Sequence, residues 1–184
     1  DFFFLLCYNL FSTLLYHKRE FFASNFLGMR NSKTYYCVLA VLVNKKEELL
    51  LIKRTDNGCW GFVEGGILFG EKPENAMRRE IKEEVGLDVD SITSLSPVSW
   101  TYNDGEKREH IVAMIYLCSV VSIKLKLNPA EVADYCWIGY NETGILKDTL
   151  TKRSERFCYG FEEVMRTYQS FKGNLVNSDN RVLT

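Results

Sequence analysis

The sequence predicts an α/β protein in which a mixed β-sheet lies between helices, an α/β/α sandwich. Three observations lead to this fold class. Short apolar runs of strand length, rich in β-branched residues, recur along the chain. A run of good helix formers, Pro73 to Val85, interrupts them. A second stretch with helical spacing of its apolar residues, Ser154 to Phe171, follows the last strand. This pattern leaves the order of the strands open.

The first two strands form a predicted hairpin. Tyr35–Val43 is a continuous apolar run, Asn44–Glu48 is a polar turn, and Leu49–Ile52 is a second apolar run. The short strand Cys59–Val63 leads into a loop that starts at Glu64. After the first helix, three further strand regions are expected: Ser91–Tyr102, mixed with turns, then Ile111–Val121 and Tyr135–Ile138. Asp104-Gly105, between the first two, is a hairpin signal.

The helix of residues 73–85 has clear start and stop signals. Pro73 suits the first turn, where no N–H is needed, and Glu74 favours the positive end of the helix dipole. Gly86 follows the helix where a left-handed cap is required. On a helical wheel the apolar side chains form one stripe, which we expect to be buried against the sheet: Met77, Ile81 and Val85.

Three glutamates of the same helix form a second stripe, about a quarter turn from the apolar one: Glu80, Glu83 and Glu84. They should lie at the edge of the buried face, where partial burial strengthens their mutual repulsion. A hard divalent cation such as Mg²⁺ or Mn²⁺ would neutralise them, because both ions prefer oxygen ligands and also bind phosphates. A solvated acidic face with lysine partners is the alternative that the trio alone leaves open.

The overall composition is that of a soluble globular protein, with 46% hydrophobic and 26% charged residues in a chain of 184. The formal net charge of -1 gives no global field that would recruit nucleic acid or an anionic membrane. A polyanionic substrate must therefore be held by a local device, for which a metal ion is the natural choice. No stable nucleic-acid partner is expected.

Six cysteines are present, and none belongs to a CxxC pair: Cys7, Cys37, Cys59, Cys118, Cys136 and Cys158. With only two histidines in the chain, a zinc site is not expected. Three of the cysteines lie in apolar runs of strand type, where a free thiol packs as a small hydrophobe. We interpret them as reduced, structural residues of a cytoplasmic protein, with disulfides as the alternative that an even number allows.

The chain begins with an apolar and aromatic segment, Phe2 to Tyr16. It is shorter than the roughly 20 residues of a membrane-spanning helix and lacks the basic leader of a signal peptide. A helix that packs on the domain or frays is expected, with a membrane anchor as the alternative. The predicted organisation is an N-terminal extension over 1–30, a domain with its C-terminal helix over 31–172, and a flexible tail over 173–184.

The spacing around the glutamates is the strongest functional signal. Gly65 is followed after five residues by Glu71, and after seven more by the run R-E-I-K-E-E-V-G-L of residues 79–87. This matches G-x5-E-x7-R-E-U-x-E-E-x-G-U, with U aliphatic, at every fixed position, and the chain therefore resembles the Nudix hydrolases. A chance match is on the order of one in ten million. The strand pattern from about residue 35 to 140 is also similar to the fold of that family.

The resemblance implies a role for each motif residue. Glu80, Glu83 and Glu84 would hold one or more Mg²⁺ or Mn²⁺ ions, with Glu83 and Glu84 as direct ligands and Glu80 as either a ligand or the base that activates water. Gly65 lets the backbone approach the ion, so that its carbonyl can be a further ligand. The remaining motif residues are expected to be structural: Glu71 and Arg79, an opposite-charge pair that ties the loop to the helix, and Gly86.

Several further residues outside the fixed motif are also predicted to have a role. Glu131 is placed where some family members supply an additional catalytic base, although an ordinary loop glutamate is an equal alternative. Leu68 and Phe69 are expected to cover the loop against the core. Many members carry Pro-Gly-Gly where this chain has Glu64-Gly65-Gly66, and a glutamate where it has Phe69, which leaves the substrate subfamily open. The candidate substrate-binding residues are Trp60, Phe62 and Arg54. For the two aromatic residues, the alternative is that they belong to the hydrophobic core.

The reaction that the resemblance implies is hydrolysis of a phosphoanhydride bond in an X–diphosphate compound. A nucleoside triphosphate is the first expectation for X because the domain is compact. ADP-ribose or a nucleotide sugar is the alternative substrate, and a non-catalytic nucleotide-sensing module is the alternative from another functional class. A small nucleotide is thus the expected partner, and the protein is expected to be a monomer or a homodimer.

Overall fold

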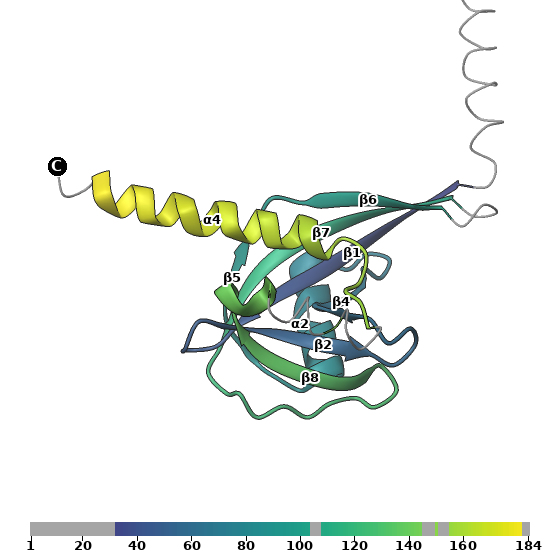
Figure 1. The fold of residues 1–184 in the computed structure, drawn as a ribbon. Helices are drawn as coiled ribbons and strands as arrows, with labels where there is room; N and C mark the ends of the chain where they lie inside the picture. The colour runs from purple at the N-terminus through teal and green to yellow at the C-terminus, as the bar shows by residue number, and fades with distance from the viewer. Residues whose placement is uncertain (1–31, 104–107, 145–149, 151–154, 182–184) are drawn as a thin grey trace, which may run out of the picture. The chain divides into compact units, whose positions relative to one another are not determined.

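The computed structural model describes residues 32–103, 108–144, 150 and 155–181 (Figure 1). The chain divides into two compact units. Within the described residues the smaller unit consists of 32–33, 101–103 and 108–110. The larger unit, described over 34–100, 111–144, 150 and 155–181, contains the motif residues 65–87 and both α-helices of the described part.

The described residues form strands, two α-helices and one short 3-10 helix, η1. In chain order they are β1 (Ser32–Val43), β2 (Glu48–Arg54), β3 (Trp60–Gly61), β4 (Val63–Gly66), α2 (Pro73–Val85), β5 (Val89–Ser94), β6 (Val98–Asn103), β7 (Arg108–Val120), β8 (Val132–Gly139), η1 (Tyr140–Glu142) and α4 (Phe161–Arg181).

The strands belong to one mixed sheet, eight-stranded over the described residues, with the central order β3-β2-β1-β7-β5. In addition, β4 pairs with β1, β6 with β7 and β8 with β2. The predicted hairpin is confirmed, since β1 and β2 are antiparallel with Val43 opposite Leu49. β2 and β8 pair antiparallel along most of their length, from Glu48 opposite Gly139 to Arg54 opposite Val132.

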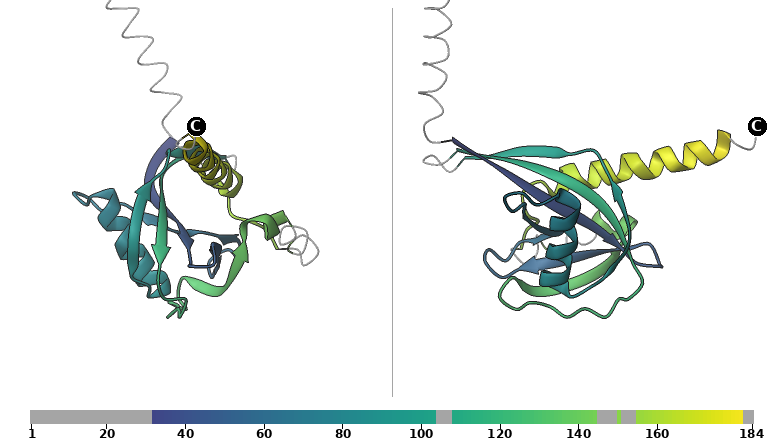
Figure 2. Two further views of the ribbon diagram at one scale, coloured as in Figure 1. Left: turned by 90° about the vertical axis from the view of Figure 1, so that its left-hand side faces the viewer. Right: turned by 180° about the vertical axis from the view of Figure 1, so that it is seen from behind.

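Two hydrophobic cores form because successive side chains of a strand point to opposite faces of the sheet. On one face, α2 packs against side chains of two strands: Val38, Ala40 and Leu42 of β1, and Leu50 and Ile52 of β2. On the opposite face, α4 packs against Leu39 and Val41 of β1 and Leu49 and Leu51 of β2. Figure 2 shows α2 and α4 on opposite sides of the strands. The predicted layering of helices around a mixed sheet is confirmed.

The predicted start of the last helix at Ser154 is wrong. Residues 155–160 are not helical: Phe157 forms a parallel β-bridge with Trp60, and Tyr159 and Gly160 form a turn. Gly160, with a φ of 80°, then redirects the chain into α4. The helix also continues to Arg181, beyond its predicted end at Phe171 and into the segment predicted as a flexible tail.

Two local expectations also need revision. The glycines of the motif, expected in a loop, belong to β4, where Gly65 pairs with Val38 and Gly66 with Cys37 of β1. Leu68 and Phe69 do not cover the loop against the core. Phe69 is fully exposed and the side chain of Leu68 is largely exposed. The loop is held by polar contacts instead.

Three sequence expectations fall on parts of the chain that the structure does not describe. These are the N-terminal segment 2–16, Cys7 within it, and the hairpin signal at residues 104–105. Over the described part of the chain, none of the helices combines the length and the apolar character needed to cross a bilayer.

Candidate active site

α2 places the motif glutamates at two levels of burial. The helix has Pro73 in its first turn and ends at Gly86, whose φ of 70° is left-handed and whose N–H donates to the carbonyl of Lys82. Its buried side includes Glu80 and Glu84 beside the apolar stripe, with residue exposures of 8% and 4%. Glu83 is exposed. The glutamate stripe therefore straddles the edge of the buried face.

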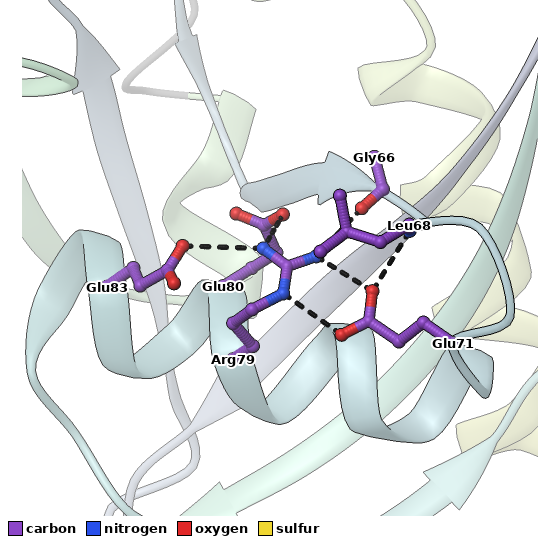
Figure 3. Close-up of polar contacts among 6 residues, drawn as sticks. All are labelled: Gly66, Leu68, Glu71, Arg79, Glu80 and Glu83. Carbon is purple, nitrogen blue, oxygen red and sulfur yellow. Dashed lines mark hydrogen bonds and ion pairs between the residues drawn. The ribbon is translucent and has the colours of Figure 1, made fainter.

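Arg79 ties the loop before α2 to the helix (Figure 3). Its Nε donates to Oε1 of Glu71 at 3.0 Å and its Nη2 to Oε2 of the same carboxylate at 2.9 Å. The Nη2 group also donates to the carbonyl of Gly66 at 2.9 Å, and the backbone N–H of Leu68 donates to Glu71 at 3.0 Å. This network fixes the loop by two-pronged hydrogen bonds between charged groups.

The same guanidinium reaches the glutamates of α2. Nη1 of Arg79 donates to Oε1 of Glu80 at 2.6 Å and to Oε2 of Glu83 at 3.3 Å (Figure 3). Burial raises the pKa of Glu80, and the contact with Arg79 acts in the opposite direction. In the described structure the positive charge nearest to Glu80 and Glu83 is thus a side chain of the motif itself.

Gly65 is required by Glu80. A Cβ placed on Gly65 would lie 1.9 Å from the carboxyl carbon of Glu80, far inside van der Waals contact. The Glu80 carboxylate is therefore seated against the backbone of β4, where any larger residue would displace it. Sequence reasoning explained this glycine by backbone approach to an ion, whereas the described contact is with a carboxylate.

Glu84 is the most unusual ionisable group of the site. Its Oε2 is buried and has no hydrogen-bond partner. Burial raises the pKa of Glu84 to about 8, the positive charge of Arg54 opposes this rise, and the neighbouring carboxylates of Glu80, Glu131 and Glu64 add to it. A buried acceptor without a partner is costly, and it points to a group that the site receives from outside.

Glu64 and Asp56 enlarge the acidic cluster, and sequence reasoning did not select them. Arg54 joins them, donating from Nη1 to Glu64 at 3.0 Å and from Nε and Nη2 to Asp56 at 3.0 and 2.9 Å. Burial raises the pKa of Glu64, and Arg54 opposes this rise. The departure from Pro-Gly-Gly at position 64 was the one available signal. Arg54, a candidate substrate ligand, is here engaged with these two carboxylates.

Glu131 lies close enough to Glu80 and Glu84 to act on both electrostatically. Its side chain is exposed, and its backbone carbonyl accepts a hydrogen bond from the N–H of Thr55 at 2.9 Å, which anchors the residue beside the end of β2. The structure thus brings together four carboxylates from β4, α2 and the loop before β8: Glu64, Glu80, Glu84 and Glu131.

The cluster consists of oxygen ligands, the kind that Mg²⁺ and Mn²⁺ prefer. The unpartnered oxygen of Glu84 fits an incoming cation. Among the described residues, however, no three His, Cys, Asp or Glu side chains already converge as a metal-binding group. The contacts of Arg79 with Glu80 and Glu83 are consistent with this, because a guanidinium occupies their oxygens.

Trp60 and Phe62 lie on the other face of the sheet. Trp60 is 7% exposed and Phe62 3% exposed, and Phe62 stacks on Phe161 with ring centroids 5.1 Å apart. The indole N–H of Trp60 donates to Glu155 at 3.0 Å. Both rings are core residues in the described structure, so their proposed role in stacking on a base stays a prediction that would require this face to open.

Comparisons with known proteins agree with this geometry. A family model described as the NUDIX domain matches residues 33–159. The nucleoside triphosphatase NudI of Escherichia coli O139:H28 is 32% identical over 114 residues, which cover 55% of this chain and 79% of that protein.

Two solved structures show the same fold. The MutT NUDIX hydrolase from Burkholderia pseudomallei aligns with a TM-score of 0.60 and 23% identity, over 73% of this chain and 98% of its own. The NUDIX domain of Shewanella oneidensis NrtR, in complex with ADP ribose, aligns with a TM-score of 0.58 and 20% identity, over 75% of this chain and 88% of its own.

The matched region contains the complete motif of residues 65–87, and it extends over more than half of the chain. The sheet between two helices is the fold that the solved relatives share. The chain therefore belongs to the Nudix family and is a Nudix-type pyrophosphohydrolase.

Proposed function

We propose that this protein hydrolyses a phosphoanhydride bond of a nucleoside triphosphate with the help of Mg²⁺ or Mn²⁺. The observation that carries the proposal is the buried oxygen of Glu84, which has no partner and lies among further carboxylates. A cation is the group that satisfies this oxygen and offsets the surrounding negative charge.

The residues that would hold the ion are Glu80, Glu83 and Glu84, with the carbonyl of Gly65. When bound, such an ion polarises phosphate oxygens and lowers the pKa of a coordinated water. The chain itself supplies the rest. Arg79 and Glu71 fix the loop, and the close fit of Glu80 on Gly65 fixes that carboxylate against β4. The site is therefore preorganised before the substrate binds, which lowers the entropic cost of bringing the reacting groups together.

Proton transfer from the attacking water is assigned to Glu80 or Glu131. Both carry a carboxylate next to Glu84, and Glu131 is exposed to the solvent from which the water comes. Burial raises the pKa of Glu80, the direction that strengthens a carboxylate as a proton acceptor, while Arg79 opposes this rise.

The choice of a nucleoside triphosphate is supported by the relative NudI, which is named as a nucleoside triphosphatase and is 32% identical. ADP-ribose and nucleotide sugars remain the alternative substrates. The alternative of a non-catalytic sensing module is disfavoured because every glutamate of the motif is retained.

The test is a panel of nucleoside triphosphates, ADP-ribose, nucleotide sugars and dinucleoside polyphosphates, with Mg²⁺, with Mn²⁺ and with chelator. Release of phosphate or pyrophosphate that needs the ion and is fastest with a triphosphate is expected. Glu84→Gln should reduce kcat by roughly 10²-fold or more, because it removes a charged group from the reacting centre. Glu74→Gln, which changes an exposed carboxylate on the same helix, is the matched control.

Metal binding is measured separately by titration with Mn²⁺. Binding that is lost in Glu84→Gln and retained in Glu74→Gln is expected. The proposal would be contradicted if turnover persisted in chelator or if Glu84→Gln left the affinity for Mn²⁺ unchanged. Faster hydrolysis of ADP-ribose than of any triphosphate would retain the chemistry and replace the substrate.

A further inference from the structure

Two large apolar side chains are exposed to solvent beside the candidate site. Phe69 is fully exposed and Leu68 is 60% exposed, and both belong to the loop between β4 and α2. Single exposed apolar residues are common on protein surfaces, but two adjacent ones on a fixed loop form a continuous apolar surface that a ligand can cover. Many Nudix members carry a glutamate where this chain has Phe69, so the ring distinguishes the chain from those members.

A tight turn holds the two side chains at the tip of the loop. The N–H of Glu71 donates to the carbonyl of Leu68 at 2.9 Å, which closes a four-residue turn over residues 68–71. Gly70, with a φ of 79°, occupies the third position of the turn, where a type II turn requires a left-handed backbone. Phe69 is the second residue, so its ring is carried by a backbone of fixed conformation.

The turn is connected to the same arginine as the motif glutamates (Figure 3). The backbone N–H of Leu68 donates to Oε2 of Glu71, which also accepts from Nη2 of Arg79. Nη1 of the same guanidinium donates to Glu80 and Glu83. Because every link in this series is a direct hydrogen bond, the turn lies at the border of the acidic cluster. A ligand whose phosphates are held at the cluster can therefore extend its remaining part over the turn.

The aromatic residues that the sequence suggested for stacking are not available in the described structure. Trp60 and Phe62 are buried on the other face of the sheet, and Phe62 stacks on Phe161. A base that stacks on an aromatic side chain needs a ring with a free face. The fully exposed ring of Phe69 meets this requirement without any opening of the core.

We propose that Phe69 stacks on the base of the nucleotide whose phosphates the acidic cluster holds, and that Leu68 extends this apolar surface. The inference rests on the proposed function, because the phosphates must first be placed at the cluster. Stacking on an aromatic ring tolerates every base, so Phe69 selects nucleotides over base-free polyphosphates and does not choose among bases. The fixed turn needs little ordering when the base binds, which keeps the entropic cost of the contact low.

The experiment compares two nucleotides with a substrate that has no base. KM and kcat of the full chain are measured with ATP, with CTP and with inorganic triphosphate. Phe69→Ala should raise KM for both nucleotides roughly tenfold or more, the effect of losing one stacked base, and should leave KM for inorganic triphosphate unchanged. Since the reaction is assigned to the carboxylates, kcat should stay near wild type. Phe69→Trp keeps a ring and should retain the low KM.

Two controls accompany these variants. Ile123→Ala removes another exposed apolar side chain, outside the loop, and should behave as wild type. Calorimetry makes the test independent of turnover. A non-hydrolysable ATP analogue, titrated with Mn²⁺ present, should bind Phe69→Ala roughly tenfold more weakly than wild type. Mn²⁺ alone should bind both proteins equally. A wild type that hydrolyses none of the substrates would contradict the proposed function, and the calorimetric comparison would still decide the role of Phe69.

Three results would overturn the inference. The first is an equal rise of KM for ATP and inorganic triphosphate in Phe69→Ala, because the loss would then concern phosphate binding. The second is an affinity for the ATP analogue that Phe69→Ala leaves unchanged. The third is a wild-type dimer that dissociates in Phe69→Ala with KM unchanged, which would assign the ring to a contact between two copies of the chain.

Discussion

Glu84 shows how a single residue can hold a site in an unfavourable state. It lies on the side of α2 that packs against the sheet, yet it carries a carboxylate, one oxygen of which is unpartnered. Replacing it by an apolar residue would relieve this burial. A glutamate at this position is explained if it lowers the stability of the free protein but binds a ligand, a trade-off that is common at functional sites.

The raised pKa of Glu84 predicts how stability depends on pH in metal-free protein. The carboxyl has a pKa of about 8 when folded and an ordinary value of 4.5. Between these values the unfolded chain releases the proton that the folded chain keeps, so the free energy of unfolding falls as pH rises. Glu84→Gln should make this fall less steep, gaining on wild type by up to about 1.4 kcal/mol for each pH unit in that window.

Urea unfolding in chelator at several pH values between 5 and 8 measures this difference. Glu74→Gln, an exposed change on the same helix, serves as the control and should follow wild type. Parallel stability curves for Glu84→Gln and wild type would show that Glu84 is not held in its protonated form.

Gly65 and Gly66 form a matched pair of adjacent glycines. A methyl group at Gly65 would collide with the Glu80 carboxylate, whereas at Gly66 nothing lies within 4 Å. Gly65→Ala should lower the free energy of unfolding by about 1–3 kcal/mol through overpacking and should remove most activity. Gly66→Ala should be tolerated in both respects. Thermal unfolding and turnover of the two variants check this, and equal behaviour would contradict the seating of Glu80 on β4.

At the scale of elements, the loop over 67–72 and helix α2 act as one unit because Arg79 connects them. The loop contributes few apolar contacts, since Leu68 and Phe69 point into solvent. Its order depends on Glu71, which accepts from Arg79 and from the backbone N–H of Leu68. Charge here replaces the hydrophobic packing that the sequence suggested.

Arg79→Lys tests this connection, because lysine cannot reproduce the two-pronged contact with Glu71. Turnover should fall by roughly tenfold or more, while the free energy of unfolding changes by about 1 kcal/mol or less, since the pair is partly exposed. Hydrogen exchange should increase at residues 67–72. Arg78→Lys, in an exposed ion pair with Glu74, is the control and should leave both measurements near wild type.

The elements that could be predicted from the sequence are those with a strong local signal. β1, β2 and α2 follow from apolar periodicity, from Pro73 and from Gly86. The start of α4 could not be predicted, because the pairing of Phe157 with Trp60 overrides the helical spacing of the preceding residues. Periodicity describes one segment at a time and carries no information on such distant partners.

The same limit applies to the site. The motif glutamates could be selected because they lie within a few residues of one another on one helix. The contact of Arg54 with Glu64 could not, since it joins the end of β2 to a residue of another strand, β4, and so depends on the arrangement of the sheet. The burial of Trp60 and Phe62 likewise depends on α4, which packs over them from the far end of the chain.

At the scale of the whole molecule, two cores share one sheet, so neither helix is stable without it. Ile81 of α2 and Met165 of α4 lie in different cores, on opposite faces. Ile81→Ala and Met165→Ala should each lower the free energy of unfolding by about 2–5 kcal/mol and shift one common transition. Phe69→Ala, at a fully exposed position, should have almost no effect.

Calorimetry and urea unfolding followed by circular dichroism distinguish the outcomes. Coincident transitions in both core variants would support a single cooperative unit around the sheet. Two separate transitions, each affected by one variant, would show that the faces unfold independently.

The sharing of one guanidinium by three carboxylates has a last consequence. Arg79 contacts Glu71, Glu80 and Glu83 at the same time. A bound cation that attracts Glu80 and Glu83 would break their contacts with Arg79, which would then keep its contacts with Glu71 and the Gly66 carbonyl. Cation binding to the acidic cluster and the rigidity of the loop before α2 are then thermodynamically coupled, so a probe on this loop can report whether the cluster is occupied.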